Sequence, residues 1–468
     1  MINKKVMAVA VTAALAAPVA AFAQASNVQI YGTMDMSMMN TSYSGTVNQA
    51  AIASTNTNAS GQSKVDLYSQ SSRLGFKGTE DLGNGLKAWF QVETGVGMDG
   101  RGTPTTAGAG NMLGGRNSAI GLEGGFGNVY IGLWDTPYKQ RLVSSMGAYG
   151  GGWLQHNGML LGGAGDSTGT VPNIGCDNLG AALTANNSNA ATQCGQIEGS
   201  TTSFHRRLSN SMNYVTPMLS GVQAKFAYSG TGQKVDAITT ASAQVITNNP
   251  TLWSMDIGYT GGPVSVGFAH ERHNGFRASA GATSTTGAIT SKNDASDTAT
   301  QLYGSYDFGV VKVNANYEKL SYGDTAPTAN PSGTLGAVNG SNNFDRSAWF
   351  LGVSAPIGNG RAFGGYSKTD GNKSCGTLGV AVTSTVAASS TNSGTFLCGS
   401  DTGSTAYTLG YEYSLSKRTQ VYVTAMNVDN KQFASFMPVV NKAGVNGTGL
   451  FQTGQDLTAF ALGMRHSF

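Results

Sequence analysis

Apolar and polar side chains alternate most clearly in the last thirteen residues of the chain, 456–468. A period of two places alternate residues on opposite faces of a β-strand. One face here is bulky and the other is small or polar. A strand that is apolar outside, polar inside and aromatic at its end is typical of a barrel in lipid and not of a soluble sheet. Counted back from the end, the bulky face carries Phe468, His466, Met464, Leu462 and Phe460.

The same alternation recurs along the chain. Apolar side chains take every second position in 86–92, 311–317 and 407–415, and the positions between them are mostly polar or small. Aromatic residues near the ends of such segments would form girdles at the two membrane interfaces. We expect these girdle residues at Phe76, Tyr228, Tyr259, Phe308 and Tyr413.

The connections between the alternating segments are of two kinds, short and long, and the two kinds strictly alternate. Seven are short and rich in turn residues, and the Asn-Gly pair at 84–85 is a strong signal for a tight hairpin. Together with eight long ones they join sixteen strands, so all the short turns lie at one rim. The long polar connections lie near 40–63, 97–114, 136–203, 230–250, 273–297, 321–345, 370–403 and 429–454.

These patterns predict an all-β fold, a sixteen-stranded antiparallel transmembrane β-barrel with short periplasmic turns and long extracellular loops. Both chain ends lie at the short-turn rim, so the first strand, from Val28 onward, can pair with the last. This closure is needed because lipid cannot satisfy the open edge of a sheet. A soluble two-sheet β-sandwich also alternates, but sixteen strands in one exported chain argue against it.

The first 23 residues have the features of a secretory signal peptide. A basic start at Lys4 and Lys5 precedes an apolar stretch, and Ala21-Phe22-Ala23 precedes Gln24. The apolar stretch is too short to span a membrane, although an uncleaved N-terminal helix is the alternative. We expect residues 1–23 to be removed, leaving a barrel of residues 24–468 in the bacterial outer membrane.

Composition removes one class of function. Charged residues make up 11% of the chain, far below the roughly 25% of soluble domains. Without Lys4 and Lys5, the 28 basic residues become 26, against 25 acidic residues. Such a balanced chain with no basic stripe offers no field that would attract nucleic acid.

Four cysteines follow the signal peptide, and an even number in an exported chain indicates disulfides. Three pairings are possible. We favour neighbours, Cys176 with Cys194 and Cys375 with Cys398, because all four lie in polar loops. Each bond would close a loop of roughly 20 residues and stabilise the fold by on the order of 3 kcal/mol. Zinc is disfavoured because neither pair is close-set and no histidine cluster joins them.

Four segments resemble motifs of the Gram-negative general porins, the trimeric diffusion porins, and most closely the β-proteobacterial type. They are Ser71-Ser-Arg-Leu-Gly-Phe-Lys-Gly-Thr-Glu-Asp-Leu-Gly-Asn-Gly85, residues 207–217, residues 415–422 and the terminal 463–468. The resemblance implies a homotrimer whose long third loop, 136–203, folds into the pore. It also implies lipopolysaccharide, small hydrophilic solutes and ions as partners, and the barrel-assembly machinery, with Phe468 as the assembly signal.

Charges that face the lumen are the candidate functional residues. With Leu74 and Phe76 facing lipid, Arg73 and Lys77 face inward, and the same alternation places the acid Glu93 inward. The alternative for any one of them is a solvated charge on the barrel wall.

A basic cluster at the constriction is implied by the resemblance. Leu208 and Met212 are expected on the lipid face, which turns Arg207 inward. Porins of the family carry arginines at the constriction, and Arg73, Arg116 and Arg207 lie at the matching positions. The strand expected to carry Arg116, from Arg116 to Gly121, alternates poorly, so the facing of Arg116 depends on the resemblance alone.

Acids that oppose these arginines are expected from the third loop, which is longer than is usual in the family. We favour Asp166 and Glu198 as the acidic side of the constriction, together with Glu93 on the wall. Acid facing base across a narrow pore would produce a transverse field that orients polar solutes. The loop offers Asp135, Asp166, Asp177 and Glu198.

Catalysis, a cofactor and a metal site have little support. His270 and His273 are three positions apart on a strand, so their rings point to opposite faces and cannot share a metal. We therefore predict a passive diffusion porin, not an enzyme, with mild anion preference. A substrate-specific channel is the alternative, but the inward aromatic residues Trp89 and Tyr303 are too few for an aromatic slide. A barrel-anchored adhesin or enzyme is a further alternative.

Overall fold

The computed structural model describes residues 28–45, 63–70, 72–99, 113–146, 154–160, 204, 207–230, 235–239, 245–248, 251–274, 290–292, 296–322, 344–371, 380–381, 397–398, 403–431, 434, 436 and 454–468. Of the predicted features, the signal peptide 1–23 lies outside these ranges. So do the acids Asp166 and Glu198 and the cysteines Cys176, Cys194 and Cys375, while Cys398 is described by its backbone only.

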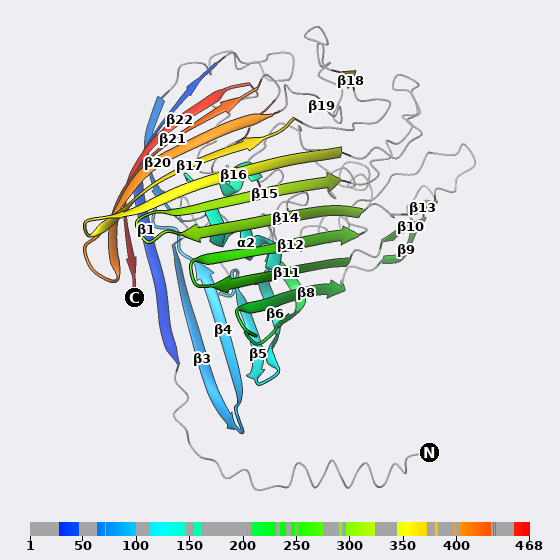
Figure 1. Ribbon diagram of the computed structural model, residues 1–468. Coiled ribbons are helices and arrows are strands. Elements are labelled where there is room, and N and C mark those ends of the chain that lie inside the picture. Colours follow the sequence, from blue (N-terminus) through cyan, green and yellow to red (C-terminus); the bar gives the residue numbers. More distant parts are fainter. Residues whose placement is uncertain are drawn as a thin grey trace, which may run out of the picture.

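The described strands form one closed antiparallel sheet that curves around a lumen (Figure 1). β1 and β22 pair from Thr33 with Ser467 to Ser44 with Asp456, which closes the barrel. β2 and β3 both pair with β1 and are two halves of one crossing, so the sheet crosses sixteen times, as the sequence predicts. The barrel strands are β1 (Gln29–Ser44), β2 (Ser63–Ser69), β3 (Arg73–Gly83), β4 (Leu86–Gly95), β5 (Ser118–Gly124), β6 (Gly127–Asp135), β7 (Arg207–Val215), β8 (Val222–Gly230), β11 (Thr251–Gly261), β12 (Val264–Asn274), β14 (Ser296–Asp307), β15 (Lys312–Tyr322), β16 (Phe344–Ile357), β17 (Gly360–Thr369), β20 (Ser404–Ser414), β21 (Thr419–Asn430) and β22 (Asp456–Ser467).

Further elements lie within the long connections. The two described helices, α2 and α3, belong to the segment 136–203, and none of the described helices is long and apolar enough to cross a membrane. The short strands outside the barrel are not foreseen from the alternation; β9, β10 and β13 form one sheet, and β18 and β19 another. Their bounds are α2 (Pro137–Met146), α3 (Asn157–Leu160), β9 (Val235–Thr239), β10 (Val245–Asn248), β13 (Thr290–Lys292), β18 (Val380–Ala381) and β19 (Leu397–Cys398).

The tight turns have the backbone that their residues favour. In the β3–β4 turn, Gly83, Asn84 and Gly85 have φ values of 85°, 52° and 76°. Glycine and asparagine adopt this left-handed region most readily, which is why Gly-Asn-Gly joins two strands in so few residues. Short turns and long connections alternate as predicted, so the two rims of the barrel differ.

The outer face of the barrel is apolar and exposed. On β22, Phe460, Leu462 and Met464 are 50–54% exposed, whereas Ala459 and Ala461 between them are buried toward the lumen. A soluble protein would bury the larger set. This inverted pattern suits a surface that lipid solvates.

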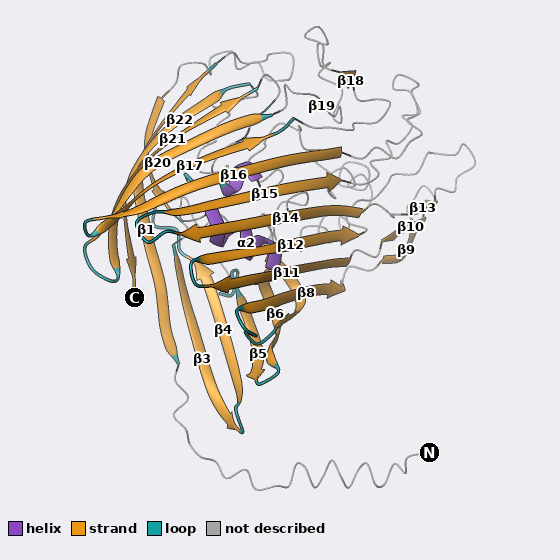
Figure 2. Ribbon diagram, viewed as in Figure 1, coloured by secondary structure: helices purple, strands orange, loops and turns teal. Residues whose placement is uncertain are grey.

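Helix α2 lies inside the ring of strands, as the purple segments of Figure 2 show. Thr136 precedes the helix and accepts a hydrogen bond from the backbone of Lys139, and Pro137 follows at the first helical position. Both are favourable residues for a helix start. Tyr138 and Leu142 are buried one turn apart and hold α2 against the inner face of the barrel.

One predicted facing is wrong. Leu208 is expected on the lipid face, but it is 2% exposed and packs with Ala227 on the inner face. The pairing of β6 with β7 shifts register between Gly132 and Trp134, and Asn210 on β7 has a positive φ of 49°. Such a bulge adds a residue to one strand and turns the side chains beyond it to the opposite face.

Candidate functional site

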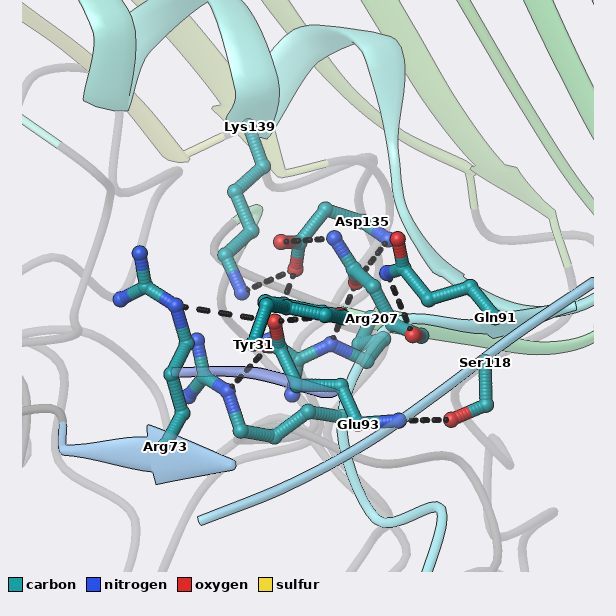
Figure 3. A network of polar contacts seen from close by, with 10 residues as sticks. Tyr31, Arg73, Gln91, Glu93, Ser118, Asp135, Lys139 and Arg207 are labelled. Carbon is teal, nitrogen blue, oxygen red and sulfur yellow. Dashed lines mark hydrogen bonds and ion pairs between the residues drawn. The ribbon is translucent and has the colours of Figure 1, made fainter. Parts of the chain in front are cut away.

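Glu93 on β4 is the centre of one half of the candidate site. Its Oε1 lies 2.6 Å from Nε of Arg116, and its Oε2 lies 3.6 Å from Nε of Arg73. The Tyr31 hydroxyl donates a hydrogen bond of 3.1 Å to the same Oε2. Figure 3 shows Arg73 pointing toward Glu93 from the neighbouring strand. One buried carboxylate thus orients two guanidinium groups.

A glycine makes this arrangement possible. Tyr31, Gly75 and Glu93 lie side by side on β1, β3 and β4. A Cβ atom at position 75 would overlap the Tyr31 ring. The absence of a side chain on β3 therefore lets the ring lie across that strand and reach Glu93.

Asp135, at the end of β6, is the centre of the other half. Its Oδ1 lies 2.6 Å from Nζ of Lys139 and 3.3 Å from Nη2 of Arg207. Asn117 links the pair, because its amide donates to Oδ2 of Asp135 at 3.1 Å and its Oδ1 accepts from Nε of Arg207 at 2.8 Å. The backbone oxygen of Asn117 accepts from Gln91, which lies one inward position from Glu93 on β4. The two halves are therefore connected (Figure 3).

Lys139 is a basic residue of this site that the sequence interpretation misses. Its ammonium group is buried, and this burial lowers the pKa of Lys139 to about 8, against the opposing effect of Asp135. The available signal was the spacing of Asp135 and Lys139, four residues apart where a Thr-Pro helix start follows a strand.

Among the described residues, the site carries more positive than negative charge. Arg73, Arg116, Lys139 and Arg207, called the basic cluster from here on, surround the two carboxylates Glu93 and Asp135. Lys77 is close by, with its Nζ 5.2 Å from the centre of the Tyr31 ring. Other ion pairs on the inner face, among the described residues, include Lys64–Asp66, Arg465–Asp35, Arg141–Asp256 and Arg361–Glu412.

The structure brings the predicted wall residues together. Arg73, Arg207 and Glu93 belong to the site from the strands expected, whereas Arg116 precedes β5 and does not lie on it. The favoured acids of the third loop, Asp166 and Glu198, lie outside the described residues. Asp135, a candidate that is not favoured from the sequence, is the acid found against Arg207.

Helix α2 is fixed to the wall beside the site by polar contacts. Arg141 donates two hydrogen bonds to the carboxylate of Asp256 on β11, at 3.1 and 2.9 Å, and its guanidinium lies 4.2 Å from the centre of the Tyr303 ring. The Tyr138 hydroxyl donates to Glu318 on β15. These contacts fix Lys139, which lies on the same helix.

The residues around α3 are fixed to a different part of the wall. The two ring nitrogens of His156 lie 2.8 Å from Oγ of Ser367 on β17 and 2.9 Å from Oγ1 of Thr408 on β20. Burial lowers the pKa of His156 to about 3, so the ring is neutral. A Cβ at Gly365 would lie 2.7 Å from the ring, so the glycine provides the space for it.

The lumen holds more aromatic side chains than the sequence interpretation counts. Trp89, Tyr130 and Trp134 form a cluster with ring centres 5.1–5.9 Å apart. On β6, Tyr130 and Trp134 point to the face opposite to that of Ile131 and Leu133. The alternation of side chains could therefore have placed both rings in the lumen. The three rings gather at one place on β4 and β6.

The histidines on β12 behave as the sequence predicts. His270 faces outward and contacts Oγ1 of Thr300 at 2.9 Å, whereas His273 is buried inside and contacts Glu271 at 2.8 Å. The described residues contain no group of three or more His, Cys, Asp or Glu side chains that could hold a metal ion.

Comparisons with known proteins agree with this geometry. The family described as Gram-negative porin matches residues 10–432. Outer membrane porin protein 32 of Delftia acidovorans is 26% identical over 473 residues, covering 100% of both chains. An outer membrane porin protein of Bordetella pertussis is also 26% identical, over 77% of this chain and 78% of its own.

Two solved structures are similar in fold. The anion-selective porin from Comamonas acidovorans has a TM-score of 0.59 at 21% identity, covering 95% of this chain and 100% of that one. The trimer form of OmpT from Vibrio cholerae has a TM-score of 0.50 at 14% identity, with the same coverage. Related proteins of this fold therefore include trimers.

Proposed function

Since this chain belongs to the Gram-negative porin family and is an outer-membrane porin channel, we propose that the basic cluster forms its constriction and gives it mild anion preference. Small hydrophilic solutes and ions would pass by diffusion through the water-filled lumen. Porins are channels rather than enzymes, and the proposal requires no catalytic step.

The observation that carries the proposal is the local excess of cations. Four basic side chains surround two carboxylates, while the net charge of the chain is only +3. Salt screens charges over roughly 8 Å at physiological ionic strength, so distant charges have little influence on an ion in the narrow zone. Selectivity must then come from the groups nearest the path.

Narrowing of the pore by the segment 136–203 is the second part of the proposal. Its support is the position of α2, whose Arg141 and Tyr138 are bonded to inward residues of β11 and β15. A segment fixed along the inner face occupies cross-section that would otherwise hold water. The helix also brings Lys139 to the basic cluster, so that narrowing and charge are coupled.

A substrate-specific channel is the second candidate, and the aromatic cluster of Trp89, Tyr130 and Trp134 is the observation that favours it. Aromatic rings can hold the flat faces of sugars. A specific channel requires such rings along the path, whereas these three gather at one place, so we prefer unspecific diffusion.

Assembly and export complete the proposal. We expect a homotrimer, and the small outward residues Gly32, Gly78 and Ala88 on β1, β3 and β4 would allow close contact between copies. Residues 1–23 would be a cleaved signal peptide, and Phe468 the signal for the barrel-assembly machinery. The four cysteines would form the two neighbour disulfides.

Planar-bilayer recording of the wild-type protein tests the proposal. In a tenfold potassium chloride gradient, the reversal potential should indicate chloride preference, and the preference should fade when both solutions are made more concentrated. Liposome swelling should give rates that fall with solute size and rise linearly with concentration. Cation preference at low salt would contradict the proposed role of the cluster. Saturation by one sugar would favour the specific channel.

A further inference from the structure

The aromatic cluster of Trp89, Tyr130 and Trp134 lies on the inner wall, next to the basic cluster and toward the short-turn rim. Trp89 is paired with Gly121, and Gly121 is paired with Tyr130, so these positions form one row across β4, β5 and β6. Trp134 lies two inward positions from Tyr130 on the same strand. Three rings from two strands thus cover one continuous part of the wall.

Neighbouring groups hold the indole ring of Trp89 in place. A Cβ atom at Gly121 would lie 2.7 Å from Cε2 and Nε1 of Trp89, so the glycine leaves the space in which the ring lies. Nε1 of Trp89 donates a hydrogen bond of 2.9 Å to Oδ1 of Asn128. Trp89 and Trp134 are half-buried, whereas Tyr130 is buried. The two indole rings are therefore fixed and partly accessible from the lumen, which lowers the entropy cost of binding a solute.

The aromatic cluster and the basic cluster are continuous along two strands. On β6, Trp134 directly precedes Asp135, whose carboxylate contacts two members of the basic cluster. On β4, Gln91 is the inward position between Trp89 and Glu93, and about 13 Å of strand separates the latter two. Flat aromatic surface and excess positive charge therefore face the same part of the lumen.

Two cations of the basic cluster are more accessible than the others. The side chains of Arg73 and Arg116 are 37% and 27% exposed, whereas those of Lys139 and Arg207 are 9% and 13% exposed. Both exposed arginines contact Glu93 through Nε. Their terminal nitrogens can then donate to the carboxylate of a solute, since a guanidinium group has five N–H donors.

The amide side chains beside the rings are used within the wall. The amide oxygen of Asn128 accepts from Trp89, and Gln91 donates to a backbone oxygen at 2.9 Å. Gln140 accepts a hydrogen bond of 3.0 Å from Nζ of Lys225. A sugar requires polar partners around its ring to fix its orientation. Rings beside cations suit a flat anion better, and a cationic aromatic solute would be repelled.

We infer that the aromatic cluster and the basic cluster together form a subsite for aromatic carboxylates. The ring of the solute packs on Trp89 and Trp134, and its carboxylate accepts hydrogen bonds from the exposed arginines Arg73 and Arg116. The inference rests on the proposed function, since it names a class of anion that the channel retains. One subsite holds a solute briefly and does not guide it along the path, so passage remains diffusive.

The test is interruption of the single-channel chloride current by benzoate in planar bilayers, titrated to give an apparent affinity. Cyclohexanecarboxylate has the same charge and nearly the same size but no aromatic face, so it should bind the wild type more weakly than benzoate does. Trp89→Leu/Trp134→Leu should weaken benzoate binding roughly fivefold, which corresponds to about 1 kcal/mol, and bring it to the level of cyclohexanecarboxylate. Trp89→Phe/Trp134→Phe keeps two aromatic rings and should retain most of the affinity.

The matched control, Trp253→Leu/Trp349→Leu, removes two tryptophans from the outer face of β11 and β16 and should bind benzoate as the wild type does. The comparison of benzoate with cyclohexanecarboxylate on the wild type needs no substitution, so the inference can be tested even if a variant does not fold.

Three results would overturn the inference. The first is equal affinity of the wild type for benzoate and cyclohexanecarboxylate, which would mean that charge alone retains the anion. The second is equal affinity of the Leu double variant and the wild type for benzoate. The third is binding of neutral benzyl alcohol as tight as that of benzoate, which would exclude the arginines from the subsite. Failure of the proposed channel function would appear separately, in the reversal potential of the wild type in potassium chloride alone.

Discussion

Lys139 of α2 and Asp135 of β6 form a 2.6 Å ion pair at the point where the strand ends and the inner helix begins. The same carboxylate lies 3.3 Å from Arg207 of β7. A group from the loop segment and a group from the wall thus share one acid. The charge of the basic cluster depends on the helix as well as on the barrel.

Selectivity should therefore depend on pH near the pKa of Lys139, which burial lowers to about 8. Below this value the lysine is protonated and the cluster has two excess positive charges; above it, the excess falls to one. Anion preference, measured as a reversal potential, should decrease between pH 7 and pH 9. Lys139→Met should show the weaker preference already at pH 7 and no step on titration.

The control for this step is Lys312→Met, which removes an inward, exposed lysine next to the β14–β15 turn. It should keep the step between pH 7 and pH 9. A step of full size in Lys139→Met would assign the titration to another group.

Removing the partner of Arg141 should loosen α2. Asp256→Asn leaves the guanidinium without its carboxylate, and we expect a loss of about 2 kcal/mol, less than for a fully buried pair because Arg141 is partly exposed. Thermal unfolding should occur at lower temperature, and single-channel traces should show more brief closures. The control Asp370→Asn, which removes an outer acid, should leave the unfolding temperature and the frequency of closures unchanged. If Asp256→Asn showed no more closures than the wild type, the ion pair would not be what fixes the helix.

Closure of the barrel should depend on the size of residue 32. A Cβ at Gly32 would lie 2.6 Å from the Phe468 ring and 2.7 Å from the backbone oxygen of Arg73. Gly32→Ala should therefore lower the unfolding temperature and slow refolding into detergent. At Gly364, the nearest atom to a Cβ is 3.5 Å away, so Gly364→Ala should be tolerated. Equal unfolding temperatures for the two variants would contradict this account of the closure.

The fold and half of the site follow from local rules. Alternation alone places Arg73 and Glu93 in the lumen, because side-chain period and strand direction need no tertiary information. Turn chemistry likewise gives the number of crossings. The same rule fails at Leu208, because a bulge with Asn210 at positive φ reverses the facing of that side chain. The sequence around Asn210 has no pattern that predicts this bulge.

The other half of the site depends on tertiary structure. Lys139 reaches Asp135 only because α2 is bonded along the inner face, for example from Arg141 to Asp256 on β11. Those partners are 115 residues apart, and no local pattern connects them. The resemblance to the family supplies the position of Arg116, which alternation cannot give.

The reversal potential of Arg73→Ser/Arg207→Ser in a tenfold potassium chloride gradient tests the central claim most directly. Removing one cation from each carboxylate eliminates the excess charge of the basic cluster, so permeability should shift toward cations while assembly is retained. Arg272→Ser/Lys319→Ser, which removes two cations from the outer face, should keep the wild-type potential. A double variant at 73 and 207 that kept the wild-type potential would show that these arginines do not line the constriction.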